Sequence, residues 1–173
     1  MGLNSPHQPA VRETQRVALR ARYGARPLPL RIVFLAQAPR DWWSLHSLYE
    51  ACLADRRFEV YVVSIGWGPW LGISGDCDAL FEALGIEAVD GRASPTAIES
   101  LRPDVLVISS PYDEFRDPAY RTEQLVRSAK VVYIPYGIDF GDASGRMSAF
   151  WYGQPLQRQA WRIFTSSPAR VEQ

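Results

Sequence analysis

The stretch LRIVFLAQAPRDWWSLHSLYEACLADRRFEVYVVSIG, residues 30–66, decides the fold. It begins with a short run rich in β-branched and aromatic side chains, which predicts a strand over residues 30–37. After the loop AQAPRDWW, apolar side chains recur at the spacing of a helix: Leu45, Leu48, Tyr49, Cys52 and Leu53. A second apolar run follows at residues 58–66. The stretch therefore predicts a strand, a loop, a helix and a second strand.

The same alternation continues to the end of the chain. The patterns predict helices over residues 77–85, 94–101, 119–129 and 168–173, and strands over residues 86–91, 104–110, 130–137 and 161–167. Ser94 is the expected N-cap of its helix, with Pro95 at the first helical position, and Gly85 is expected to end the helix before it.

Strands that are almost entirely apolar and that alternate with helices indicate a parallel sheet covered on both faces. The sequence therefore predicts an α/β fold, a doubly wound Rossmann-like sheet of six strands in the order 3-2-1-4-5-6. Residues 30–173 are expected to form this single domain, because 173 residues with 47% hydrophobic content suit one compact core.

Charge and cysteine content exclude several classes of function. Nineteen basic residues balance nineteen acidic ones, so no overall field favours nucleic acid, and we expect no nucleic-acid partner. Cys52 and Cys77 lie in no metal-binding motif, so we expect neither a metal site nor a disulfide, and Cys52 is expected in the core. No secretion signal or membrane-spanning run is present, which predicts a cytoplasmic protein.

The first 29 residues are expected to form a basic N-terminal arm with helical composition, ended by Gly24 and Pro27. One interpretation is a solvated helix lying on the domain. The alternative is peripheral contact with the inner face of a membrane or with an anionic polymer, because Val11, Val17 and Leu19 form a weak apolar stripe.

Ligands of such sheets bind outside the carboxyl ends of the strands, near the switch between strands one and four. The first loop lacks the GxGxxG pattern that lets a backbone approach a pyrophosphate, so we expect no NAD or FAD and no other cofactor. It carries Trp42 and Trp43, of which at least one is expected to cap the core, whereas an exposed indole would stack on a sugar or polyol. His46, one helical turn further on, is either a candidate catalyst or a hydrogen-bonded surface residue.

The loop after the fourth strand carries Ser109, Ser110, Tyr112 and Asp113. The serines are expected either to cap the next helix or to donate to a ligand phosphate. The loop is long for a connection between a strand and a helix, and this favours a ligand-binding role for Tyr112 and Asp113. The alternative is that Asp113 and the acidic residues near it are simply solvated.

The stretch PYG at residues 135–137 ends the fifth strand, because Pro135 removes a donor from the sheet. Gly137 permits a positive φ or a close ligand approach, so Tyr136 is expected to point into the ligand crevice; a plain strand-ending turn is the alternative. Asp139 in the same loop, and Ser166 and Ser167 after the sixth strand, complete the candidate ligand-binding residues.

Taken together, the segments LAQAPRDWWSLHSLYEACLAD, FEVYVVSIG, LRPDVLVISSPYD, VVYIPYGIDFGD and WRIFTSSP resemble the N-terminal domain of the CDP-glycerol glycerophosphotransferase family. These enzymes build teichoic-acid and capsule-type polymers and have the GT-B fold. The resemblance covers the chain from about Arg31 onward, and it rests on the order and spacing of the segments.

The resemblance implies a polyol or sugar-phosphate acceptor on this domain, and a CDP-glycerol donor on a second Rossmann-like domain or on a partner chain. The chain ends where the second domain of the family would begin, so we expect little catalysis from this half alone. Many family members place a catalytic histidine where this chain has Tyr136. Phenol groups lose their proton only at about pH 10, so Tyr136 is expected to hydrogen-bond or stack on the acceptor.

Two other interpretations stay open. One is a binding or scaffold module that keeps the Rossmann-like core without the chemistry. The other is an independent small enzyme or nucleotide-binding protein of the flavodoxin-like type.

Overall fold

The computed structural model describes residues 29–72, 77–137 and 153–164. Within them, six strands form one sheet, and every neighbouring pair is parallel. The order is β3-β2-β1-β4-β5-β6, which confirms the predicted doubly wound, Rossmann-like arrangement. The strands are β1 (Leu30–Ala36), β2 (Phe58–Ser64), β3 (Val89–Asp90), β4 (Val105–Ile108), β5 (Lys130–Tyr133) and β6 (Arg162–Ile163).

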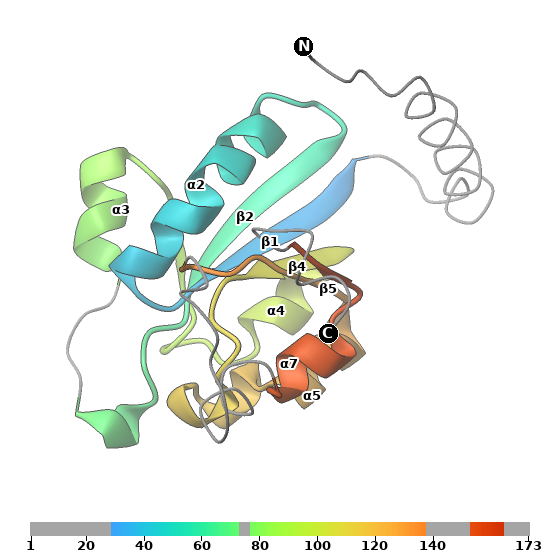
Figure 1. Ribbon diagram of the computed structural model, residues 1–173. Helices are drawn as coiled ribbons and strands as arrows, with labels where there is room; N and C mark the ends of the chain where they lie inside the picture. The colour runs from blue at the N-terminus through green and yellow to red at the C-terminus, as the bar shows by residue number, and fades with distance from the viewer. Residues whose placement is uncertain (1–28, 73–76, 138–152, 165–173) are drawn as a thin grey trace, which may run out of the picture.

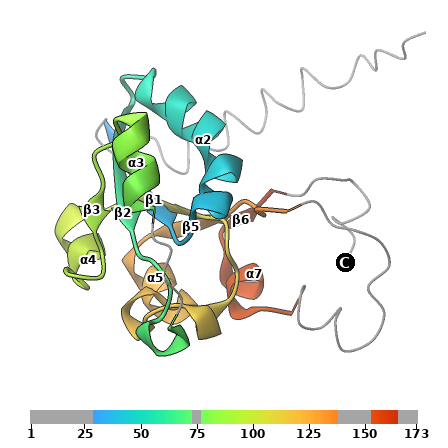
Figure 2. The same cartoon turned by 90° about the vertical axis from the view of Figure 1, so that its left-hand side faces the viewer.

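Helices cover both faces of the sheet, as Figures 1 and 2 show. The α-helices are α2 (Pro39–Leu53), α3 (Asp78–Leu84), α4 (Ala97–Leu101), α5 (Thr122–Ser128) and α7 (Pro155–Gln159). The 3-10 helices are η1 (Pro69–Leu71), η2 (Asp113–Phe115) and η3 (Pro118–Tyr120). No helix in these described segments is both long enough and apolar enough for a membrane crossing.

Alternate residues of the four central strands, β2, β1, β4 and β5, supply two separate cores, because successive side chains point to opposite faces. Phe34 of β1 packs with residues of α2 and α3 on one face. Leu35, its neighbour, packs with residues of α4, α5 and α7 on the other. Cys52 of α2 lies in the first core, as its helical spacing predicts. Burial on both faces explains why these strands carry almost no polar residues.

The strand order also decides between the alternatives for the fold. A flavodoxin-like sheet has the order 2-1-3-4-5, in which the third strand lies beside the first. Here β3 pairs with β2, and β4 pairs with β1. The flavodoxin-like topology is therefore wrong for this chain, whereas an independent small enzyme or nucleotide-binding protein stays a prediction.

Two predicted helix starts are wrong. Ser94 is not the N-cap of α4: the N–H of Ala97 donates to its carbonyl at 2.9 Å in a preceding turn, and Thr96 occupies the N-cap. The predicted helix at residues 119–129 is divided, because the Asp117 side chain accepts from the N–H of Ala119 and caps η3. A side-chain acceptor near a helix start competes with the regular ladder, as Asp117 does here. At α4 it is a backbone turn at Ser94 that delays the helix start.

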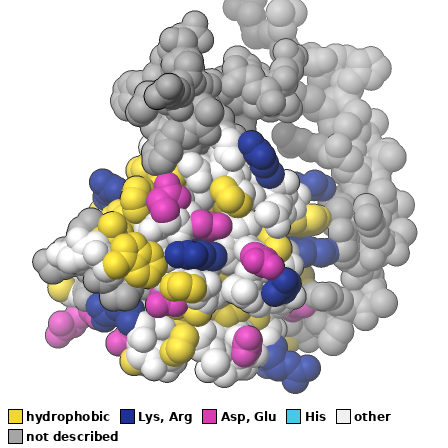
Figure 3. Space-filling view, turned by 90° about the horizontal axis from the view of Figure 1, so that it is seen from below, with side chains coloured by type: hydrophobic (Ala, Val, Ile, Leu, Met, Phe, Trp, Pro, Cys, Tyr) yellow, Lys and Arg dark blue, Asp and Glu magenta, His cyan; other side chains and the backbone are white. Residues whose placement is uncertain are grey.

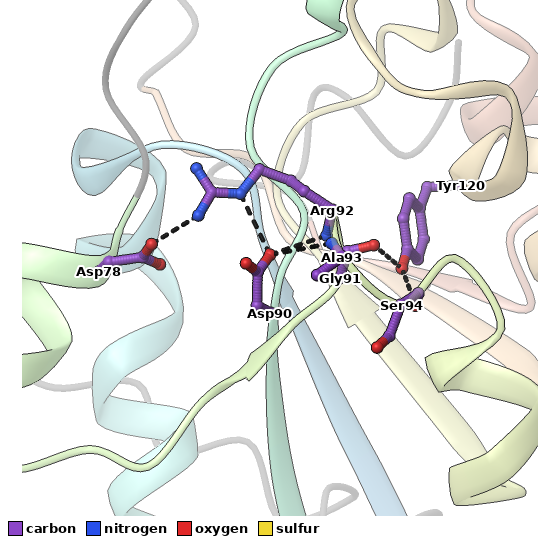
Figure 4. A network of polar contacts seen from close by, with 7 residues as sticks. All are labelled: Asp78, Asp90, Gly91, Arg92, Ala93, Ser94 and Tyr120. Carbon is purple, nitrogen blue, oxygen red and sulfur yellow. Dashed lines mark hydrogen bonds and ion pairs between the residues drawn. The ribbon is translucent and has the colours of Figure 1, made fainter.

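The end of β3 packs closely against η3 (Figure 4). The hydroxyl of Tyr120 donates to the carbonyl of Gly91 at 2.7 Å and also lies 3.0 Å from that of Ser94. Burial raises the pKa of Tyr120 to about 12, so the hydroxyl keeps this proton at neutral pH. Beside it, Arg92 pairs with Asp90 and with Asp78 of α3.

Gly91→Ala is expected to lower the free energy of unfolding by about 1–3 kcal/mol. A Cβ at Gly91 would lie 2.7 Å from the Tyr120 hydroxyl, 2.8 Å from Cγ1 of Val63 and 3.0 Å from the carbonyl of Ser64. Urea unfolding would measure the change, with Gly137→Ala as the control because a Cβ at Gly137 meets nothing within 4 Å. Equal destabilisation by the two substitutions would contradict the expected overpacking.

Candidate functional site

The carboxyl ends of the central strands meet at one edge of the sheet. In the register, Leu35 of β1 pairs with Ile108 of β4, and Ile108 pairs with Tyr133 of β5. Ser109 and Tyr136 therefore leave neighbouring strands on the same edge, as the parallel order predicts. Asp139, Ser166 and Ser167 lie outside the described residues.

The connection after β1 is shorter than predicted. Instead of an eight-residue loop AQAPRDWW, Gln37 and Ala38 alone separate β1 from α2, which begins at Pro39. Proline is favoured at a first helical position, since its missing N–H has no helical partner there. Trp42 and Trp43 therefore belong to the helix and not to a loop.

The two tryptophans have opposite environments. Trp42 is completely buried, and its ring makes edge contacts with Phe34, Tyr49 and Phe81. This confirms that at least one tryptophan completes the core, and Trp42 presents no surface to a ligand. Trp43 is 57% exposed.

His46 lies on α2, and no polar or ring contact in the described part of the chain joins it to Tyr136. Its Nε2 is 3.4 Å from Oε1 of Glu50, one turn along, and its ring contacts Trp42, Trp43 and Tyr49. Within the described residues, these polar and ring contacts all lie within α2. The structure therefore does not bring the two candidate catalytic residues together.

Four aromatic side chains, Trp67, Tyr112, Phe115 and Tyr136, follow the strand ends, and we name them the aromatic rim. Trp67 comes after β2, Tyr112 and Phe115 after β4, and Tyr136 after β5. The ring of Phe115 contacts the rings of Trp67 and Tyr112 at centroid distances of 6.1 and 5.6 Å. The rim thus gathers residues that lie far apart in the sequence.

Arg40, the second residue of α2, joins the two ends of this rim. Its guanidinium carbon lies 5.6 Å from the ring centroid of Trp67 and 5.4 Å from that of Tyr136. These rings come from strands on opposite sides of the β1–β4 pair, so Arg40 spans the switch point of the sheet. Its side chain is still 65% exposed. A guanidinium that rests its face on aromatic rings keeps its N–H edge for an anion.

Buried backbone contacts fix the rim. The carbonyl of Phe115 accepts from Nε2 of Gln37 at 2.9 Å and from the N–H of Gly68 at 2.8 Å. Gln37 is buried directly after β1, and Gly68 lies after β2. The loop after β4 is therefore tied to both neighbouring strands.

The two serines after β4 are buried. The Ser109 hydroxyl donates to the backbone carbonyl of Asp41 at 3.3 Å, which joins the end of β4 to the first turn of α2. Ser109 therefore does not cap the following helix, contrary to one of its predicted roles. Ser110 is 3% exposed.

Asp113 makes internal contacts and is not simply a solvated acid. Its Oδ1 accepts from the N–H and hydroxyl of Thr122, at 3.0 and 2.8 Å. The same oxygen pairs at 2.5 Å with Nη2 of Arg116, whose side chain is completely buried. Burial lowers the pKa of Arg116 to about 10, so the guanidinium remains charged at neutral pH. The loop after β4 thus encloses an ion pair.

Asp41, beside Arg40, has an unusual environment. Its side chain is 1% exposed, and Nε of Arg40 lies 3.4 Å from its Oδ1. Within the described part of the chain, neither carboxylate oxygen has a hydrogen-bond partner. Burial raises the pKa of Asp41 to about 6, although the nearby Arg40 acts in the opposite direction.

Gly137 does not adopt the positive φ that was one of its two predicted uses. It is exposed, and a Cβ built there meets nothing within 4 Å. A close ligand approach, the other predicted use, stays a prediction; Tyr136 beside it is half-buried.

The surface seen from below mixes acidic, basic and apolar side chains, and charges of one sign do not gather in its coloured part (Figure 3). Within the segments that the structure describes, no three His, Cys, Asp or Glu side chains lie together as metal ligands would. The charges near the strand ends are arranged in pairs, Arg40 with Asp41 and Arg116 with Asp113.

Comparison with known proteins finds no matching family model, no matching curated protein and no matching solved structure. The resemblance to the CDP-glycerol glycerophosphotransferases thus stays a prediction.

Proposed function

We propose that this chain is the acceptor-binding domain of a glycerophosphotransferase or glycosyltransferase of cell-surface polymer synthesis. It would hold a polyol or sugar phosphate at the carboxyl edge of the sheet. The donor, CDP-glycerol in the resembled family, would bind a second domain or a partner chain. The protein would work in the cytoplasm, with the basic arm available for peripheral contact with the membrane.

The observation that carries this proposal is the position of Arg40 across the switch point. Its guanidinium is held by the faces of Trp67 and Tyr136 and remains largely exposed. Such a group can pair with a phosphate through two parallel N–H donors. The neighbouring ring faces suit the C–H surface of a polyol or sugar.

Arg40→Ala is expected to weaken the binding of glycerol 3-phosphate about tenfold or more, since hydrogen bonds to charged groups contribute about 1.5–3 kcal/mol. Isothermal titration calorimetry would measure the dissociation constant. Arg127→Ala is the matched control: Arg127 on α5 is 66% exposed, close to the 65% of Arg40, but its guanidinium pairs with Glu123. The two variants should therefore differ only at the candidate site.

Equal affinity of the wild type, Arg40→Ala and Arg127→Ala would remove Arg40 as the phosphate site. The transfer reaction is tested separately, by adding a donor-side domain and CDP-glycerol and measuring glycerol phosphate transfer. Binding that depends on Arg40 without any transfer would support the non-catalytic binding module instead.

A further inference from the structure

Asp41 carries a buried carboxylate that faces Nε of Arg40 at 3.4 Å, a distance that fits an ion pair but not a full hydrogen bond. The side chain is 1% exposed, and neither oxygen has a hydrogen-bond partner within the described residues. Burying a carboxylate without donors is costly, and structural carboxylates are normally paired or hydrogen-bonded. The position lies at the switch point, in the first turn of α2.

The groups around Asp41 leave the carboxylate free to accept. The hydroxyls of Ser109 and Ser44 both donate to the backbone carbonyl of Asp41, not to its side chain. The N–H of Asp41 donates to the carbonyl of Ala38. Among the described residues, Arg40 is the charged side chain that faces the carboxylate, at an ion-pair distance of 3.4 Å.

We propose that Asp41 accepts a hydrogen bond from a ligand hydroxyl that lies close to the phosphate held by Arg40. This inference rests on the proposed function in taking Arg40 as the phosphate site. Since Nε of Arg40 and Oδ1 of Asp41 are 3.4 Å apart, the two ligand groups must also be close. The site therefore selects phosphate monoesters with a hydroxyl near the ester, such as polyol phosphates, over simple alkyl phosphates.

Access to the carboxylate follows from the position of Arg40. Nε of Arg40 lies 3.4 Å from Oδ1 and the Arg40 side chain is 65% exposed, so a small shift of this side chain would open the carboxylate to a ligand. A phosphate that pairs with the guanidinium would weaken its contact with Asp41, while the rings of Trp67 and Tyr136 keep the guanidinium close by. The ligand hydroxyl then takes the place beside Oδ1, and the carboxylate gains the donor that it lacks.

The test compares the binding of glycerol 3-phosphate and n-propyl phosphate, which share the phosphate and a three-carbon chain but differ in hydroxyls. Calorimetry is run on the wild type, Asp41→Asn and Asp41→Leu. The wild type should prefer glycerol 3-phosphate about tenfold, as expected for one hydrogen bond to a charged group. The preference should fall from Asp to Asn and disappear with Leu, since the amide keeps one acceptor and the leucine has none.

Propyl phosphate is also the internal control for folding. Its affinity should not fall in either variant, and it should rise where the loss of the carboxylate frees Arg40 from its ion pair, which shows that the Arg40 site is intact. A preference that persists in Asp41→Leu, or equal affinity of the wild type for both esters, overturns the assignment of Asp41 and leaves the phosphate site standing. Failure of both esters to bind the wild type overturns the phosphate site and, with it, this inference.

A pH series distinguishes a ligand-binding carboxylate from a purely structural one, because only the first would make the ratio of the two affinities depend on pH. Because burial raises the pKa of Asp41 to about 6, the group becomes protonated below that pH and is then a weaker acceptor. The preference for glycerol 3-phosphate should therefore rise with pH through this range in the wild type and stay flat in Asp41→Leu. Both esters carry a phosphate that titrates at about pH 6, so their affinity ratio cancels that contribution.

Discussion

Replacing Asp113 with alanine is expected to lower the free energy of unfolding by about 3–5 kcal/mol. The substitution leaves the guanidinium of Arg116, which is completely buried, without its ion-pair partner. It also removes the acceptor for the N–H and hydroxyl of Thr122. Urea unfolding monitored by circular dichroism would measure the loss.

The control for this prediction is the exposed pair of Glu123 and Arg127 on α5. Its Nη2–Oε1 distance is 2.5 Å, the same as in the buried pair, but both side chains are about two-thirds exposed. Glu123→Ala should therefore change stability by less than about 1 kcal/mol, because exposed ion pairs contribute little. Similar losses in the free energy of unfolding for Asp113→Ala and Glu123→Ala would show that burial does not determine how much an ion pair contributes to stability.

A double substitution separates two contributions to the loss of stability: the missing attraction between Asp113 and Arg116, and the cost of an unpaired buried guanidinium. Arg116→Met in the Asp113→Ala background removes the uncompensated guanidinium and keeps an apolar side chain in its place. This double variant should be more stable than Asp113→Ala alone, since a buried pair is often replaceable by apolar groups whereas half a pair is not.

The sheet was predictable because its evidence is local and repeated. Each strand is an apolar run, each connection contains a helix, and the handedness of crossovers then restricts the order. The segment boundaries were harder. Pro39 is a helix-start signal that lies close behind β1, and weighting it more strongly would have placed Arg40 and Asp41 in the first turn of α2. Because the prediction placed both residues in a loop, it did not single them out as candidate site residues.

Other parts of the site depend on contacts that no local pattern encodes. Arg116 lies in the polar stretch DEFRD, which is typical of a solvated loop, yet the fold buries it. Trp67 joins the rim only because the loops after β2 and β4 meet through the carbonyl of Phe115. Trp42 and Trp43 are adjacent and have the same side chain, so composition alone likewise does not show which of them is buried.

These adjacent tryptophans provide the second large expected effect. Trp42→Ala should lower the free energy of unfolding by about 3–5 kcal/mol, because it removes a large, fully buried side chain and leaves a cavity. The indole contacts Phe34 of β1 and Phe81 of α3, so its loss affects the packing of two elements on the sheet. Thermal and urea unfolding would measure the change.

Trp43→Ala is the matched control, since it makes the same chemical change one residue along the same helix. Its side chain is 57% exposed, so the change in stability should stay within about 0.5 kcal/mol. Equal losses in the two variants would mean that α2 does not face the sheet as described. Since α2 also carries Arg40 and Asp41, a helix rotated about its axis would move both away from the aromatic rim and would remove the basis of the ligand site.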